Sequence, residues 1–133
     1  MMLYCKMYLI ALGIFLSLDL IWLGLIAKNY YHQQLEHLLA PSFSVLPAVV
    51  FYLIFILGLV YFVIVPNFEV RDFNKLLRDA AFLGFLTYAT YDLTNAATLK
   101  NWSWQITILD LAWGTCLSTL VCCGTYWILT KII

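Results

Sequence analysis

Three aspartates lie inside apolar stretches that are long enough to cross a membrane: Asp19, Asp92 and Asp110. A carboxylate in the hydrocarbon core costs about 2.5–3.5 kcal/mol on insertion scales, so such residues usually face a protein interior, a partner or a water-filled cavity. Two of the three occur in the same phrase, Leu-Asp-Leu-x-Trp, at Leu18–Trp22 and at Leu109–Trp113. These residue types point to a buried polar site for a proton, a cation or a small solute.

The composition requires a membrane around those stretches. The chain has 133 residues, of which 65% are hydrophobic and only 11% are charged. A soluble domain is about 45–50% apolar and about 25% charged, and a fold of this size has no interior large enough for so many apolar side chains. The formal net charge is zero, so nothing indicates nucleic-acid binding.

Four spans follow from the need for about 20 apolar residues per crossing. We predict them at about residues 7–27, 46–65, 76–99 and 106–129 of a single domain that covers residues 1–133. The apolar runs are continuous and do not alternate as barrel strands would, so each span is expected to be a helix. The predicted fold class is therefore an all-α integral membrane protein, a bundle of four transmembrane helices.

The basic residues indicate how the bundle is oriented. With an even number of spans both termini share a side, and that side holds five basic residues against two on the other, Lys28 and Lys100. This asymmetry favours both termini in the cytoplasm. The long connection after the first span has leucines at helical spacing between polar residues, which predicts a short helix at the membrane interface.

The three aspartates are expected at one depth. Asp19 lies nine residues before Lys28, Asp92 lies eight residues before Lys100, and Asp110 lies ten residues after Lys100. At about 1.5 Å per helical residue, all three are on the order of 12–15 Å below the external surface. Since the helices of a small bundle are all near neighbours, we predict one polar pocket in the outer half of the membrane.

Residues near the aspartates extend the predicted pocket. Tyr88 and Asn95 share a helix face with the aspartate of the third span, at spacings of four and three. Each Leu-Asp-Leu-x-Trp tryptophan lies one turn beyond its aspartate and can shield it or offer an indole N–H. Aspartates in a membrane can also be purely structural, hydrogen-bonded between helices. The predicted substrate-binding or ion-binding residues are Asp19, Asp92, Asp110, Asn95, Tyr88, Trp22 and Trp113.

Signals for metals, cofactors and familiar catalytic motifs are missing. His32, Glu36 and His37 cluster in the first connection but lack the His-Glu-x-x-His pattern of zinc proteases. The four cysteines have no zinc spacing, and neither a Gly-x-Ser-x-Gly elbow nor a Gly-rich nucleotide loop occurs. The sequence therefore predicts no metal site and no cofactor.

Several phrases resemble those of a known family: Leu18–Gly24, Tyr91–Asn95 followed by Ala97–Lys100, and Asp110–Thr115. They look like the bacterial predicted-membrane-protein family of domain of unknown function 2177, in the same order and over essentially the whole chain. The resemblance implies a small multi-pass protein of the bacterial inner membrane with four spans. It brings no established activity, so it supports the architecture and the choice of residues.

Three functions are open at this point. The first is binding or transport of a proton, cation or small solute. Four spans are few for a transporter, so this function would need a homodimer. The repeated phrase lies on the first and last spans, which run antiparallel, and is similar to a weak inverted repeat. The second is a membrane enzyme that uses Asp92 and Asp110 as general acid and base on a lipid or other apolar substrate, oriented by Tyr88 and Asn95. The third is an accessory subunit whose polar stripes bind the helices of a partner membrane protein.

Overall fold

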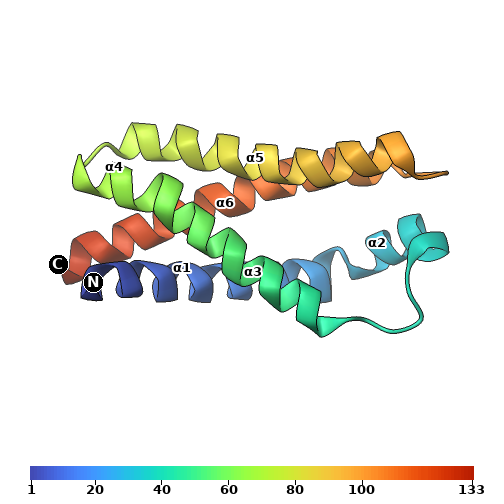
Figure 1. Ribbon diagram of the computed structural model, residues 1–133, viewed down its shortest axis with the longest axis horizontal. Coiled ribbons are helices and arrows are strands. Elements are labelled where there is room, and N and C mark those ends of the chain that lie inside the picture. The colour runs from blue at the N-terminus through green and yellow to red at the C-terminus, as the bar shows by residue number, and fades with distance from the viewer.

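The computed structural model describes residues 1–133, and every element in it is helical. The predicted all-α fold class is thereby confirmed. Four long segments lie side by side, and both chain termini are at the same end of the bundle (Figure 1). The segments are α1 (Met2–Ile21) with the π-helical turn η1 (Trp22–Ile26); α3 (Val45–Leu59) with the π-helical turn η3 (Val60–Ile64) and α4 (Val65–Glu69); α5 (Phe73–Thr98); and α6 (Trp104–Ile132). The connection after the first segment holds a short helix, α2 (Lys28–Leu35), and the 3-10 turn η2 (Glu36–Leu38).

Three of the four segments are long and apolar enough to cross a membrane: Met2–Ile26, Val45–Glu69 and Trp104–Ile132. They cover the predicted first, second and fourth spans, and the first of them begins earlier than expected because the helix continues past the apolar run. The predicted third span coincides with α5. This helix is long enough but less apolar than the other three segments, because Thr, Tyr, Asn and Asp side chains follow one another along it.

Each of the first two segments contains one wide helical turn. In the second segment η3 ends two residues before Pro66, which has no N–H for the helical ladder, and a wider turn is one way in which a helix accommodates proline. In the first segment η1 holds Trp22, whose carbonyl accepts the Ala27 N–H at 2.8 Å. Turns of this kind are frequent at functional sites, and this one adjoins the predicted pocket.

The most extensive helix pair is α5 with α6, which run antiparallel (Figure 1). Glycines permit their close approach, since a Cβ at Gly84 would lie on the carbonyl oxygen of Gly114 and on the side chain of Ser118. A Cβ at Gly114 would in turn meet the ring of Tyr88. Small residues at a crossing let two helix backbones come together, so this pair holds two of the three aspartates in a fixed relation.

The other helices leave space at the end of the bundle that is remote from the termini. The buried apolar core gathers near the termini, with Met7, Phe15 and Ile64 among its fully buried side chains. Further along, α3 diverges from α5 (Figure 1), and the parts of its segment that pack on α5 are η3 and α4.

Candidate functional site

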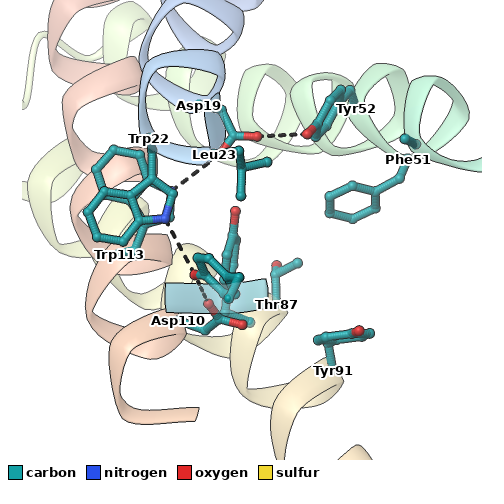
Figure 2. A pocket seen from close by; sticks show the side chains of 12 residues that line it. Asp19, Trp22, Leu23, Phe51, Tyr52, Thr87, Tyr91, Asp110 and Trp113 are labelled. Atoms are coloured by element: carbon teal, nitrogen blue, oxygen red, sulfur yellow. Dashed lines mark hydrogen bonds between the residues drawn. The ribbon is translucent and has the colours of Figure 1, made fainter. Parts of the chain in front are cut away.

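A cavity of about 410 Å³ lies between α1, η1, α2, α3, α5 and α6. Its size lies within the range of about 300–1,000 Å³ that is common for small-ligand pockets. Seven of its twelve lining residues are aromatic, two are aspartates and none is basic. Figure 2 shows Asp19 and Asp110 apart from each other at the cavity, with the two indoles on one flank and Phe51 on the other. The lining residues are Asp19, Trp22, Leu23, Tyr31, Ala48, Phe51, Tyr52, Thr87, Tyr88, Tyr91, Asp110 and Trp113.

Asp19, near the end of α1, accepts hydrogen bonds from two other helices. The Tyr52 hydroxyl of α3 donates to its Oδ2 at 2.7 Å, and the Trp113 Nε1–H of α6 donates to its Oδ1 at 3.2 Å (Figure 2). The side chain is nearly buried, at 4% exposure. Both carboxyl oxygens of Asp19 therefore have donors from other helices, as buried polar atoms usually do.

Asp110, on α6, accepts a hydrogen bond from the short helix α2 and not from one of the long helices. The Tyr31 hydroxyl of α2 donates to its Oδ1, and the Trp22 Nε1–H donates to the Tyr31 oxygen at 3.4 Å. Burial, together with the hydrogen bond to Asp110, raises the pKa of the Tyr31 hydroxyl, so it stays protonated as the donor. The short helix α2 therefore contributes a neutral hydroxyl to the cavity lining beside Asp110.

The two Leu-Asp-Leu-x-Trp phrases face each other across this site. The rings of Trp22 and Trp113 are stacked, with centroids 4.3 Å apart and planes 10° from parallel. Trp113 donates to Asp19, on the other helix, and Trp22 reaches Asp110 through the Tyr31 hydroxyl. Each indole N–H thus serves the carboxylate of the opposite phrase and not that of its own, which spacing along one helix could not reveal.

Asp92, the third aspartate, is fully buried but does not line the cavity. Neither of its carboxyl oxygens has a hydrogen-bond partner. The Asp110 carboxyl and the Thr107 hydroxyl lie beside it, and that hydroxyl accepts the Trp102 Nε1–H at 2.8 Å. A buried oxygen without a donor is costly. One proton shared between the carboxyls of Asp92 and Asp110 would give one oxygen of Asp92 a partner and leave the other without one.

The structure brings together most, but not all, of the residues singled out from the sequence. Asn95 is absent from the cavity lining, as is Asp92, which lies behind Asp110. The predicted site residues that do line the cavity are Asp19, Trp22, Tyr88, Asp110 and Trp113. The two tyrosines that donate to the aspartates, Tyr31 and Tyr52, were not among the residues predicted from the sequence. The aromatic cluster around Tyr52, in a span without charges, was the available signal for that residue, whereas Tyr31 stands in a polar connection and gave none.

Replacing Tyr31 with phenylalanine should lower the free energy of unfolding by about 1.5–3 kcal/mol, because a hydrogen bond to a charged group contributes that much. The Trp22 N–H would lose its acceptor in the same step. Thermal unfolding in nanodiscs would measure the change. Tyr30→Phe is the matched control, since the Tyr30 hydroxyl makes an exposed bond of 3.3 Å to Gln105. Equal losses in the two variants would contradict the role assigned to Tyr31.

Comparison with known proteins adds the family to this geometry. No curated protein and no solved structure matches the chain. Residues 4–127 match the family described as predicted membrane protein, DUF2177, and this range includes every residue of the cavity. The resemblance seen in the three sequence phrases is confirmed. The chain therefore belongs to the predicted membrane protein family DUF2177.

Proposed function

We propose that this membrane protein binds a cation or small solute in the cavity between Asp19 and Asp110 and transports it. The observation that carries the proposal is a cavity with two carboxylates and no basic group to pair with them. The salt bridge of the protein, between Lys75 and Asp79, involves neither carboxylate. Carboxylates within a helical bundle are usual components of ion and proton pathways in membranes, and unpaired ones attract positive charge.

The proposal includes four crossings with both termini in the cytoplasm. Helix α5 has 26 residues, which corresponds to about 39 Å, enough for a hydrocarbon core of about 30 Å. Its antiparallel packing on α6 and the common end of the two termini (Figure 1) support a fourth span. The excess of basic residues toward that end supports its cytoplasmic location. The cavity then lies in the outer half of the bilayer, and the family resemblance favours the bacterial inner membrane.

Asp92 supports a link between the bound cation and a proton. Its carboxyl lies directly beside that of Asp110 and away from the cavity. A proton held between the two carboxyls reduces the negative charge that Asp110 presents to a ligand, and a cation beside Asp110 makes that proton easier to release. Binding of the cation and binding of the proton therefore compete at Asp110. A homodimer would supply the additional helices that a transport path needs.

The two alternatives from the sequence have less support. A general acid–base pair must reach the substrate, and Asp92 does not line the cavity. An accessory subunit would direct its aspartates outward to absent partner helices. All three are instead buried within the single chain, with exposures of 4%, 0% and 8% for Asp19, Asp92 and Asp110.

Thermal unfolding in the presence of candidate ligands tests the proposal. Protein in nanodiscs would be heated with inorganic cations, organic ammonium salts and neutral solutes in turn. A ligand at 100 times its Kd stabilises the folded state by about 2.7 kcal/mol, and the double variant Asp19→Asn with Asp110→Asn should lose this gain. Asp72→Asn, at the N-cap of α5 and remote from the cavity, should retain it. If no compound stabilises the wild type more than the double variant, the proposal is wrong.

A ligand found in this way should also enter proteoliposomes that contain the wild-type protein. Because the ligand is proposed to bind at this site before it is transported, uptake of the ligand should fall at least tenfold in the Asp110→Asn variant. Binding without uptake would leave a receptor or storage site and would remove the transport part of the proposal.

A further inference from the structure

The cavity wall is aromatic around most of its circumference. The parallel indoles of Trp22 and Trp113 form one flank, and Phe51, itself stacked on Phe55 at 5.5 Å, lies on the other. Tyr52 and Tyr88 also contribute to the lining. The face of an aromatic ring carries partial negative charge and attracts a cation within about 6 Å of its centroid. Several aromatic rings beside two carboxylates are the features by which proteins recognise ammonium groups.

The carboxylates themselves are poorly arranged for a metal ion. Both oxygens of Asp19 and one of Asp110 already accept hydrogen bonds, and the Asp92 carboxyl lies beside that of Asp110. No three His, Cys, Asp or Glu side chains are grouped so that they could hold a metal ion. Calcium takes six to eight oxygen ligands, and magnesium requires an octahedral set. An organic ammonium ion, with its charge spread over carbon-bearing substituents, needs no such ligand shell.

The shape of the cavity adds an apolar component to the ligand. Two of the rings that line the cavity, Phe51 of α3 and Tyr91 of α5, are 42% and 60% exposed. In a bilayer, these rings would meet the acyl chains. A bound molecule can therefore place its charged end near the aspartates and extend an apolar end past these two rings.

We infer that the ligand is an organic ammonium ion, held by the charges of Asp19 and Asp110 and by the aromatic faces around them. This inference deepens the proposed function and rests on it. It gives the class of ligand, and it excludes inorganic cations and uncharged solutes as the preferred occupants.

Competition between three kinds of compound tests the inference. The protein would be placed in nanodiscs of phosphatidylglycerol, which has no ammonium group of its own, and titrated with radiolabelled choline. Sodium, potassium, magnesium and the dimethylbutanol in which carbon replaces the choline nitrogen would serve as competitors. Choline should bind about tenfold or more tightly than each of them, given the strength of cation–aromatic contacts. Empty nanodiscs and the double aspartate variant give the background.

The outcomes separate the inference from the proposed function. The inference would be overturned if an inorganic cation bound more tightly than choline, or if the uncharged alcohol bound as tightly as choline. The proposed function would be preserved in both cases, provided that the binding still depended on the aspartates. Binding of none of the compounds would overturn both. Choline binding that persists unchanged in the double aspartate variant would likewise overturn both, because the carboxylates would then have no part in it.

A ring substitution provides an independent readout that leaves the carboxylates intact. Phe51→Leu keeps an apolar side chain at the cavity but removes the aromatic face, so choline affinity should fall about 3- to 30-fold. Affinity for the uncharged alcohol should change much less. Phe62→Leu, an exposed position in η3 outside the cavity, is the matched control. An equal change for choline and for the alcohol would show that Phe51 acts by shape alone and would contradict the inference.

Discussion

Replacing Asp92 with asparagine should raise the free energy of unfolding by about 1–3 kcal/mol. Both oxygens of Asp92 are buried without a hydrogen-bond donor, and each such group costs about that much. The amide has the same shape as the carboxyl but brings two N–H donors, which can reach the neighbouring Asp110 carboxyl. Thermal or denaturant unfolding of the two proteins in the same nanodiscs would measure the gain.

Asp19→Asn provides the contrast at a second buried aspartate. Both oxygens of Asp19 already accept hydrogen bonds, from Tyr52 and Trp113, so the same substitution offers no gain there and weakens charge-assisted bonds. A rise in stability at Asp92 alone would show that this carboxyl is retained at the expense of stability, as groups with a functional role often are. A fall in stability in Asp92→Asn would instead mean that its carboxyl makes a structural bond.

Replacing Gly84 with valine should cost about 3 kcal/mol or more and reduce the yield of folded protein. A Cβ at this position would overlap the Gly114 carbonyl and the Ser118 side chain, so α5 and α6 would have to separate. Overpacking of a well-filled contact usually costs about 1–3 kcal/mol, and here backbone is involved on the opposite helix. Size-exclusion chromatography and the unfolding temperature would report the effect.

Gly58→Val is the matched control, because a Cβ at Gly58 meets nothing within 4 Å. Both glycines lie within α-helices, so the intrinsic helix preference of valine affects the two variants alike. Comparable losses at the two positions would show that close packing of α5 on α6 is not what stabilises the bundle.

The helices themselves followed from the sequence because the length of an apolar run sets the length of a membrane helix. Each of the four predicted ranges contains a helix, although the ends differ by a few residues; the first begins at Met2 and not near residue 7. The hydropathy of α5 is lower than that of the others, since Thr, Tyr, Asn and Asp side chains interrupt its apolar residues. Its crossing therefore stays a prediction that rests on length and on packing against α6.

The composition of the site could be predicted only in part, because residue counting gives depth along the helix and not rotation about it. Asp92 and Asp110 are at similar calculated depths, yet Asp110 meets the cavity and Asp92 lies behind it. The partners of the carboxylates depend on which helix faces which, so the donors Tyr31 and Tyr52 could not be found from a single helix pattern. Only the folded arrangement reveals that Trp113 serves Asp19.

The crossed indole contacts restrict how the bundle can move. Sliding α1 along α6 by one residue, about 1.5 Å, would break the 3.2 Å bond from Trp113 to Asp19 and offset the stacked rings. These contacts therefore fix the register of the first helix against the last in the halves that are remote from the chain termini. Helix α3 is tied to the aspartates by the Tyr52 hydroxyl alone, so the indole contacts place no such restriction on α3.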